Sequence, residues 1–143
     1  MEISNKISNH AFFKIALNDA LKHPFRNEVK SIHSALVVRG GNIISRGLNR
    51  PKRNVFSRLY SKHPRCVIHS EIDAILQARR KSDLRGAKIY VLRIRKDNAQ
   101  VANSRPCANC MRAIKNYGIK KVIYTIDGND FESFNLSEYG KNQ

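Results

Sequence analysis

The chain of 143 residues contains no tryptophan, only three cysteines and no long hydrophobic run. Its apolar stretches, such as residues 34–38, fall far below the ~18 residues that a membrane-spanning helix needs. No apolar segment follows Met1 in the manner of an export signal, so we expect a cytoplasmic protein without a membrane span. An odd number of cysteines in such a protein argues against a disulfide framework and favours cysteine in a metal-binding or catalytic role.

Acidic residues are scarce as well. The chain has 11 Asp and Glu residues and 27 Lys and Arg residues, which gives a formal net charge of +16. Residues 46–65 hold seven cations and no acid, whereas residues 127–138 hold four acids and no cation. A charge this positive favours polyanionic partners, either nucleic acid or the phosphate of a nucleotide. A basic surface that serves only solubility is the alternative, because charge alone determines neither fold nor chemistry.

Apolar residues recur with helical and strand periods in alternation, which predicts one α/β domain over residues 1–143. Three helices are predicted: residues 9–22 with Asn9 as the cap, His69 to about Lys81, and Pro106 to Gly118. Strands are predicted at 32–38, 43–46, 87–94 and 121–126, with a segment at 131–134 that pairs back on the last of them. Residues 47–66 are expected to form a long functional loop, residues 95–105 a polar loop, and residues 127–143 an acidic tail.

Two predicted helix starts carry the metal-binding residue types. His69-Ser70-Glu71 begins the second helix, and Pro106-Cys107-Ala108-Asn109-Cys110 begins the third. Together the two segments match the H-x-E and P-C-x-x-C signature of zinc deaminases. Chance gives the cysteine segment in only about 0.002 of chains of this composition, so the pair is a specific signal.

The spacing of these residues suits catalytic metal chemistry. Cys107 and Cys110 lie three residues apart on one helix face, and their place in the first turn is expected to lower their thiol pKa values. With His69 they give three ligands, which leaves the fourth zinc position for water. Zinc then lowers the pKa of that water toward ~7 and makes hydroxide available. Glu71 is expected to take the water proton and deliver it to the ring nitrogen and the leaving amine.

The sequence resembles the CMP/dCMP-type, or cytidine deaminase-like, zinc deaminases over residues 30–126. The similar segments are the hairpin at 32–44, Gly47-Leu48-Asn49-Arg50-Pro51, His69-Ser70-Glu71, residues 86–91, Pro106–Cys110 and residues 118–122. The resemblance implies an α/β/α sandwich with a mixed central sheet of about five strands flanked by helices. It also implies that the active site lies between two helix N-termini.

The resemblance further implies the roles of individual residues. One Zn²⁺ per chain would be held by His69, Cys107 and Cys110, with Glu71 as the proton shuttle. Asn49 would contact the base or sugar of the substrate. The backbone N–H of residue 70, where the family usually has Ala and this chain has Ser70, would hold the base carbonyl.

The basic segment beside Asn49 offers three candidates for binding the substrate phosphate: Arg50, Lys52 and Arg53. The alternative is that this loop is solvated and binds no substrate. We therefore predict hydrolytic deamination of cytosine to uracil in a nucleotide such as dCMP or CMP. The first alternative is cytosine or adenine in single-stranded DNA, RNA or tRNA, since the Gly-x-Asn-Arg-Pro turn resembles that of tRNA adenosine deaminases. The long segment 95–105 and the antiparallel end expected over 122–134 argue for the nucleotide.

The second alternative is a catalytically silent, zinc-stabilised nucleic-acid-binding domain. Cys66 lies three residues before His69 and would close a four-ligand structural site with it, which would leave Glu71 without a role. Otherwise Cys66 is a small packed residue. His33 and His63 are expected to lie outside the metal site, and homo-oligomerisation stays open.

Overall fold

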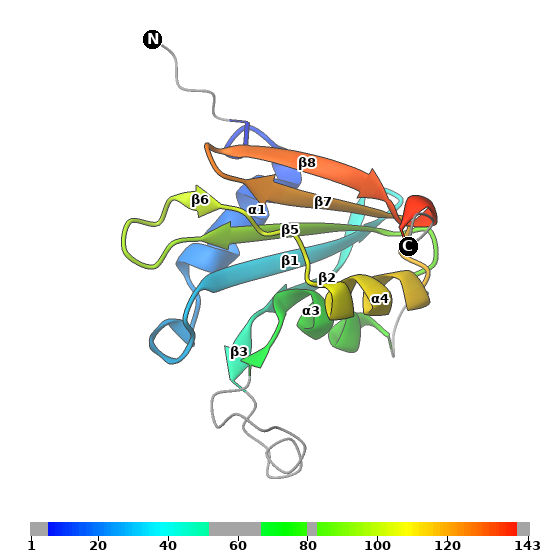
Figure 1. The fold of residues 1–143 in the computed structure, drawn as a ribbon, viewed down its shortest axis with the longest axis horizontal. Coiled ribbons are helices and arrows are strands. Elements are labelled where there is room, and N and C mark those ends of the chain that lie inside the picture. The colour runs from blue at the N-terminus through cyan, green and yellow to red at the C-terminus, as the bar shows by residue number, and fades with distance from the viewer. Residues whose placement is uncertain (1–5, 52–66, 80–82, 140–143) are drawn as a thin grey trace.

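The computed structural model describes residues 6–51, 67–79 and 83–139 (Figure 1). Its helices are α1 (Ala11–Leu21), α3 (Ser70–Ala78) and α4 (Ala108–Asn116), with two 3₁₀ turns, η1 (Arg26–Glu28) and η2 (Leu136–Glu138). The main sheet contains β1 (Ile32–Arg39), β2 (Asn42–Leu48), β5 (Lys88–Ile94), β6 (Val101–Ala102), β7 (Lys121–Ile126) and β8 (Asp130–Asn135). A separate pair consists of β3 (Arg50–Pro51) and β4 (Val67–Ile68).

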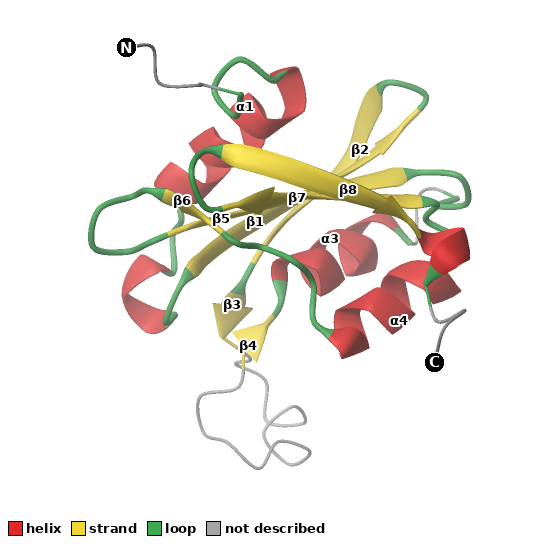
Figure 2. Ribbon diagram, turned by 45° about the horizontal axis from the view of Figure 1, so that its top comes forward, coloured by secondary structure: helices red, strands yellow, loops and turns green. Residues whose placement is uncertain are grey.

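The main sheet is mixed, with the order β2-β1-β5-β7-β8 and with β6 paired to β5. Only the β5–β7 pair is parallel among the described strands. Helix α1 covers one face, and α3 and α4 lie side by side on the other, as Figure 2 shows. The prediction of an α/β/α sandwich with a mixed sheet is confirmed.

Strand β1 explains why the chain needs helices on both faces. Its residues Ile32 and Leu36 pack in the cluster beneath α1, whereas Ala35 and Val37 pack in the cluster beneath α3 and α4. All four are fully buried, so this strand is apolar on both sides, as strands at the centre of a sheet are.

Three predictions about local structure need correction. Helix α1 is capped by His10 and not by Asn9, because the imidazole Nδ1 accepts the backbone N–H groups of Phe12 and Phe13. Helix α3 ends at Ala78 rather than near Lys81. The segment 95–105 is not all loop, because it contains the short strand β6, which pairs with the buried strand β5. The prediction that residues 131–134 pair back on the preceding strand is confirmed by β8.

Helix α3 lies unusually close to strand β2. A Cβ atom on Gly47 would collide with the backbone of Ser70 and Ala74, so only glycine permits this approach. The Ser45 hydroxyl reinforces it by donating to the Ala74 carbonyl at 2.6 Å. The beginning of α3, with His69 before it, is thereby fixed over the sheet.

The longest described helix, α1, has 11 residues. No helix in the described ranges has the length and hydropathy of a membrane span.

We expect Gly47→Ala to destabilise the fold, because the added methyl group must push α3 away from β2. Overpacking of this kind costs about 1–3 kcal/mol. Thermal unfolding of the variant should therefore occur several degrees below that of the natural chain. The control is Gly40→Asn in the same hairpin, where nothing lies near the site of the new Cβ and asparagine tolerates the positive φ of 58°. An unchanged melting temperature for Gly47→Ala would show that α3 can move without cost.

Candidate metal centre

Three potential ligand atoms converge where α3 and α4 begin. His69 precedes α3 with extended backbone, and Cys107 caps α4, its sulfur accepting the backbone N–H of Cys110. The His69 Nδ1 atom lies 3.2 Å from the Cys110 Sγ atom and 3.8 Å from the Cys107 Sγ atom. All three ligand atoms lie within 4.8 Å of one another. The structure thus assembles the three residues that the sequence proposed, from segments some 40 residues apart.

The chemistry and spacing of this group suit zinc. Bond lengths of ~2.3 Å to sulfur and ~2.0 Å to nitrogen give ligand separations of roughly 3.5–3.8 Å in a tetrahedral site. The two measured His69 to cysteine separations lie close to this range. One imidazole and two thiols are also a donor set that zinc favours.

Burial changes the titration of one ligand. Cys110 is buried, and burial together with the Glu71 carboxylate raises the pKa of its thiol well above the usual value. The prediction that the helix start would lower this pKa is wrong for Cys110 without a metal, because desolvation outweighs the helix dipole. A bound cation reverses the balance, since a coordinating thiol is deprotonated.

Glu71 lies beside this group but is not one of the three ligands. Its side chain is 4% exposed, and its carboxylate is close enough to Cys110 to contribute to the shift of the thiol pKa. Its Oε1 atom accepts the Ser70 hydroxyl at 2.7 Å. Sequence reasoning assigned only the backbone of Ser70, so the contact through its side chain was missed. The hydroxyl orients the glutamate next to the ligands.

The short β3–β4 pair brings Asn49 close to His69 of the metal centre. Arg50 is paired with Ile68, and the antiparallel register therefore carries Asn49 toward His69. Asn49 is 5% exposed, and its side-chain Nδ2 donates to the Ser31 carbonyl at 2.7 Å. Its Oδ1 accepts the backbone N–H of His33 at 2.9 Å. The carboxamide is thus fixed in orientation.

A second histidine completes this network. The Nδ1 atom of His23 accepts the Phe25 backbone N–H, so the hydrogen sits on Nε2. This N–H faces both the backbone carbonyl of Asn49 at 2.7 Å and its Oδ1 at 2.9 Å. Nothing in the sequence signals the contact, because His23 follows α1 and lies 26 residues before Asn49.

His33 lies outside the ligand group, as expected. Its Nε2 atom hydrogen-bonds with the Ser31 hydroxyl at 2.9 Å. Burial, and then the charge of Arg93, lower the pKa of His33 to about 4. The ring is therefore neutral near neutral pH.

Of the three residues predicted to bind the substrate phosphate, the structure describes Arg50. The guanidinium of Arg50 contacts the buried carboxylate of Asp73 at 2.6 Å, so it is held against α3. The predictions for Lys52, Arg53, Cys66 and His63 lie outside the described residues.

Comparison with known proteins adds to this geometry. Residues 6–126 match the family model for the cytidine and deoxycytidylate deaminase zinc-binding region. No protein of curated function matches the chain in sequence. The dCMP deaminase from the cyanophage S-TIM5 has a similar fold, with a TM-score of 0.51 and 22% identity over 79% of this chain and 81% of that one. Cytidine deaminase from Burkholderia pseudomallei gives a TM-score of 0.63, with 18% identity over 91% of this chain and 94% of the other.

A third similar structure is a diaminohydroxyphosphoribosylaminopyrimidine deaminase/5-amino-6-(5-phosphoribosylamino)uracil reductase from Thermotoga maritima. It is 29% identical, with a TM-score of 0.51, and the likeness covers 79% of this chain but 28% of that protein. The three likenesses agree with the fold described above. Since the family model spans most of the chain and contains the converging His69, Cys107 and Cys110, the chain belongs to the cytidine and deoxycytidylate deaminase zinc-binding family.

Proposed function

We propose that the protein is a hydrolytic zinc deaminase that converts cytosine to uracil in a nucleotide such as dCMP or CMP. The observation that carries this proposal is the buried Glu71 carboxylate beside a His-Cys-Cys ligand group. A purely structural metal site has no use for a buried acid at that place, because burying a carboxylate is costly.

Each residue has a distinct part in the proposed reaction. His69, Cys107 and Cys110 hold one zinc ion, which when bound lowers the pKa of water to about 7. Glu71 takes the proton of the attacking water and passes it to the ring nitrogen and then to the leaving amine. The reaction consumes one water and releases ammonia. The backbone N–H of Ser70 holds the base carbonyl, and Asn49 contacts the base or sugar.

Two features favour a free nucleotide over a polynucleotide. Strand β8 pairs antiparallel with β7 through a tight turn, as the sequence led us to expect for nucleotide deaminases. In addition, one similar fold is that of a cyanophage dCMP deaminase solved in complex with dCMP and dUMP. Since Arg50 is held by Asp73, we assign the phosphate first to Lys52 and Arg53.

The metal assignment predicts one zinc per chain. Cys107→Ser should lose most of the zinc and unfold at a lower temperature, because metal binding is coupled to folding. Metal analysis and thermal unfolding of the purified proteins measure both effects. Cys66→Ser is the matched control and should keep its zinc. Full zinc in Cys107→Ser, or loss of zinc in Cys66→Ser, would contradict the three-ligand site.

The catalytic assignment is tested by ammonia release from dCMP, CMP, deoxycytidine, cytidine and single-stranded oligonucleotides. We expect dCMP or CMP to react faster than the nucleosides. Glu71→Gln should keep its zinc and lose at least ~10²–10⁴-fold in turnover, the usual contribution of a general acid–base group. Oligonucleotides reacting far faster than dCMP would support the polynucleotide alternative. A natural chain inactive on every substrate would support the silent zinc domain.

The Asn49 network predicts that His23 positions this residue for the substrate. His23→Ala removes the donor to Asn49 and should raise the KM for the nucleotide about tenfold, the effect of ~1.4 kcal/mol, with a smaller change in kcat. His23→Gln, which retains an N–H at that distance, should restore much of the loss.

The control for the His23 experiment is His10→Ala at the other end of the same helix. That change removes a helix cap and should lower stability without altering the KM. An unaltered KM in a folded, zinc-loaded His23→Ala protein would refute the positioning role.

A further inference from the structure

Seven of the 19 lysine and arginine residues in the described ranges lie at one end of the molecule. We call this end the basic pole, and its members are Arg39, Arg79, Arg85, Lys88, Lys115, Lys120 and Lys121. It lies where α3 and α4 end, at the right of Figure 1, whereas the metal centre lies where these helices begin. Nine helical residues span about 13 Å, so the pole is well separated from the ligands.

Backbone contacts show that these residues are neighbours. Lys88 and Lys121 are direct partners in the parallel β5–β7 pair. The backbone N–H of Lys120 donates to the Ala87 carbonyl. On the other side, Arg39 donates to the carbonyl oxygen of Asp83 at 3.0 Å. These contacts join three segments that are far apart in sequence, namely Arg39, residues 83–88 and residues 120–121.

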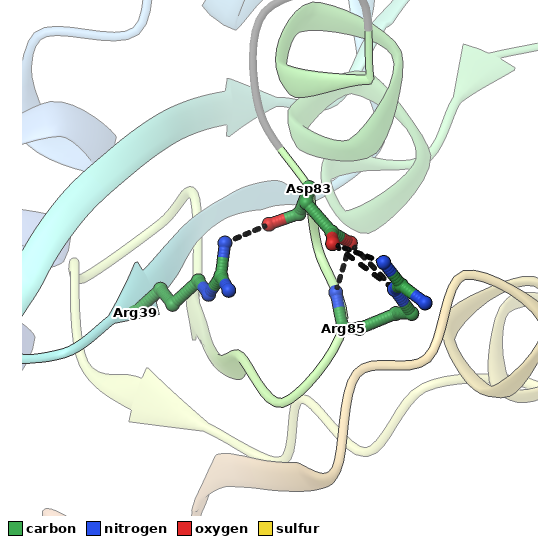
Figure 3. Close-up of polar contacts among 3 residues, drawn as sticks. All are labelled: Arg39, Asp83 and Arg85. Carbon is green, nitrogen blue, oxygen red and sulfur yellow. Dashed lines mark hydrogen bonds and ion pairs between the residues drawn. The ribbon is translucent and has the colours of Figure 1, made fainter.

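The acids at this end do not balance the seven cations. Only Asp83 and Glu138 belong to the described segments there. Figure 3 shows that the Asp83 carboxylate is already held by Arg85, whose guanidinium contacts both carboxylate oxygens at 2.8–3.1 Å. The net charge of the pole is strongly positive.

Folding contacts account for only three of these seven cations. Arg39 and Arg85 both contact Asp83, and the Lys115 ammonium donates to the Tyr139 carbonyl at 2.8 Å. Lys115 is the only one of the seven cations in the last turn of a helix, where a cation offsets the helix dipole. The Lys88–Lys121 pair places like charges on adjacent strands, which destabilises a sheet. A bound polyanion would remove this repulsion.

A hollow at the basic pole has the size and the polar lining that a phosphate group requires. It has a volume of about 420 Å³ and lies between the end of α4 and the β8–η2 segment. Lys115, Lys120, Asn135 and Ser137 line it, and no carboxylate does. Within the described part of the chain, neither the Lys120 ammonium nor the Ser137 hydroxyl has a hydrogen-bond partner. These groups are the donors that a phosphate group requires.

We propose that the basic pole binds the phosphodiester backbone of nucleic acid, at a surface separate from the metal centre. A lipid surface fits less well, because Tyr117 is the only large apolar side chain exposed at this end among the described residues. The proposal does not depend on the proposed deaminase activity. It also explains cationic charge that a mononucleotide substrate does not use.

The test is fluorescence anisotropy of a labelled 20-nucleotide single strand and of the corresponding duplex, titrated with zinc-loaded protein at 50–200 mM salt. The pole variant is Lys120→Glu with Lys121→Glu. The control, Lys14→Glu with Arg95→Glu, changes the net charge equally at two exposed residues outside the pole. We expect the pole variant to bind at least tenfold more weakly than the natural chain at 50 mM salt. Its log–log salt slope on the single strand should fall by about 1.4, since each contacted phosphate contributes ~0.7.

The control variant should lose less than threefold in affinity, and dCMP should not displace the oligonucleotide. Equal weakening of both variants would overturn the proposal, because the effect would then be one of total charge. Displacement by dCMP would overturn it too, since the strand would be occupying the metal centre. Absence of binding by the natural chain, or binding to phosphatidylserine vesicles without binding to nucleic acid, would exclude this partner. None of these readouts requires turnover, so they stand apart from the deaminase assay.

Discussion

The backbone of α3 lies directly on the backbone of β2 at Gly47, and the rest of the site depends on this approach. It fixes the position of His69, which must meet two cysteines from a different helix. Asp73, on the first turns of α3, extends the same contact by accepting the backbone N–H of Leu48 at 3.0 Å. A helix held by backbone contact has little freedom to shift, which is what a metal site with closely spaced ligands requires.

Buried polar groups set the positions of the residues around the ligands. Asn49 is satisfied by His23, His33 and Ser31, and Glu71 by the Ser70 hydroxyl. Such groups cost free energy when unpaired, so each contact favours one orientation of the side chain. Asn49 and Glu71 are thereby held in place by residues outside the group of three potential metal ligands.

The two helices that form the metal centre also separate it from the basic pole. Their N-termini, with a positive dipole end, face the thiols, and their C-termini point toward the end where the cations gather. The positive dipole ends favour anionic thiolates at the metal centre, and the negative dipole ends favour the cations of the basic pole. The two nine-residue helices thus have the metal centre at their N-termini and the basic pole at their C-termini.

The sequence by itself determined most of the helices and strands and the residues proposed for the metal centre. Apolar periodicity located β1, β5, β7 and the three helices of the described ranges. The H-x-E and P-C-x-x-C segments predicted the group of His69, Cys107 and Cys110 that the structure brings together. Only the tertiary structure decided that His10 caps α1, that His23 holds Asn49 and that Arg50 pairs with Asp73. Local patterns encode helices, strands and contiguous motifs because those depend on neighbouring residues. Contacts between residues about 20 or more positions apart depend on how the layers pack, which no local pattern records.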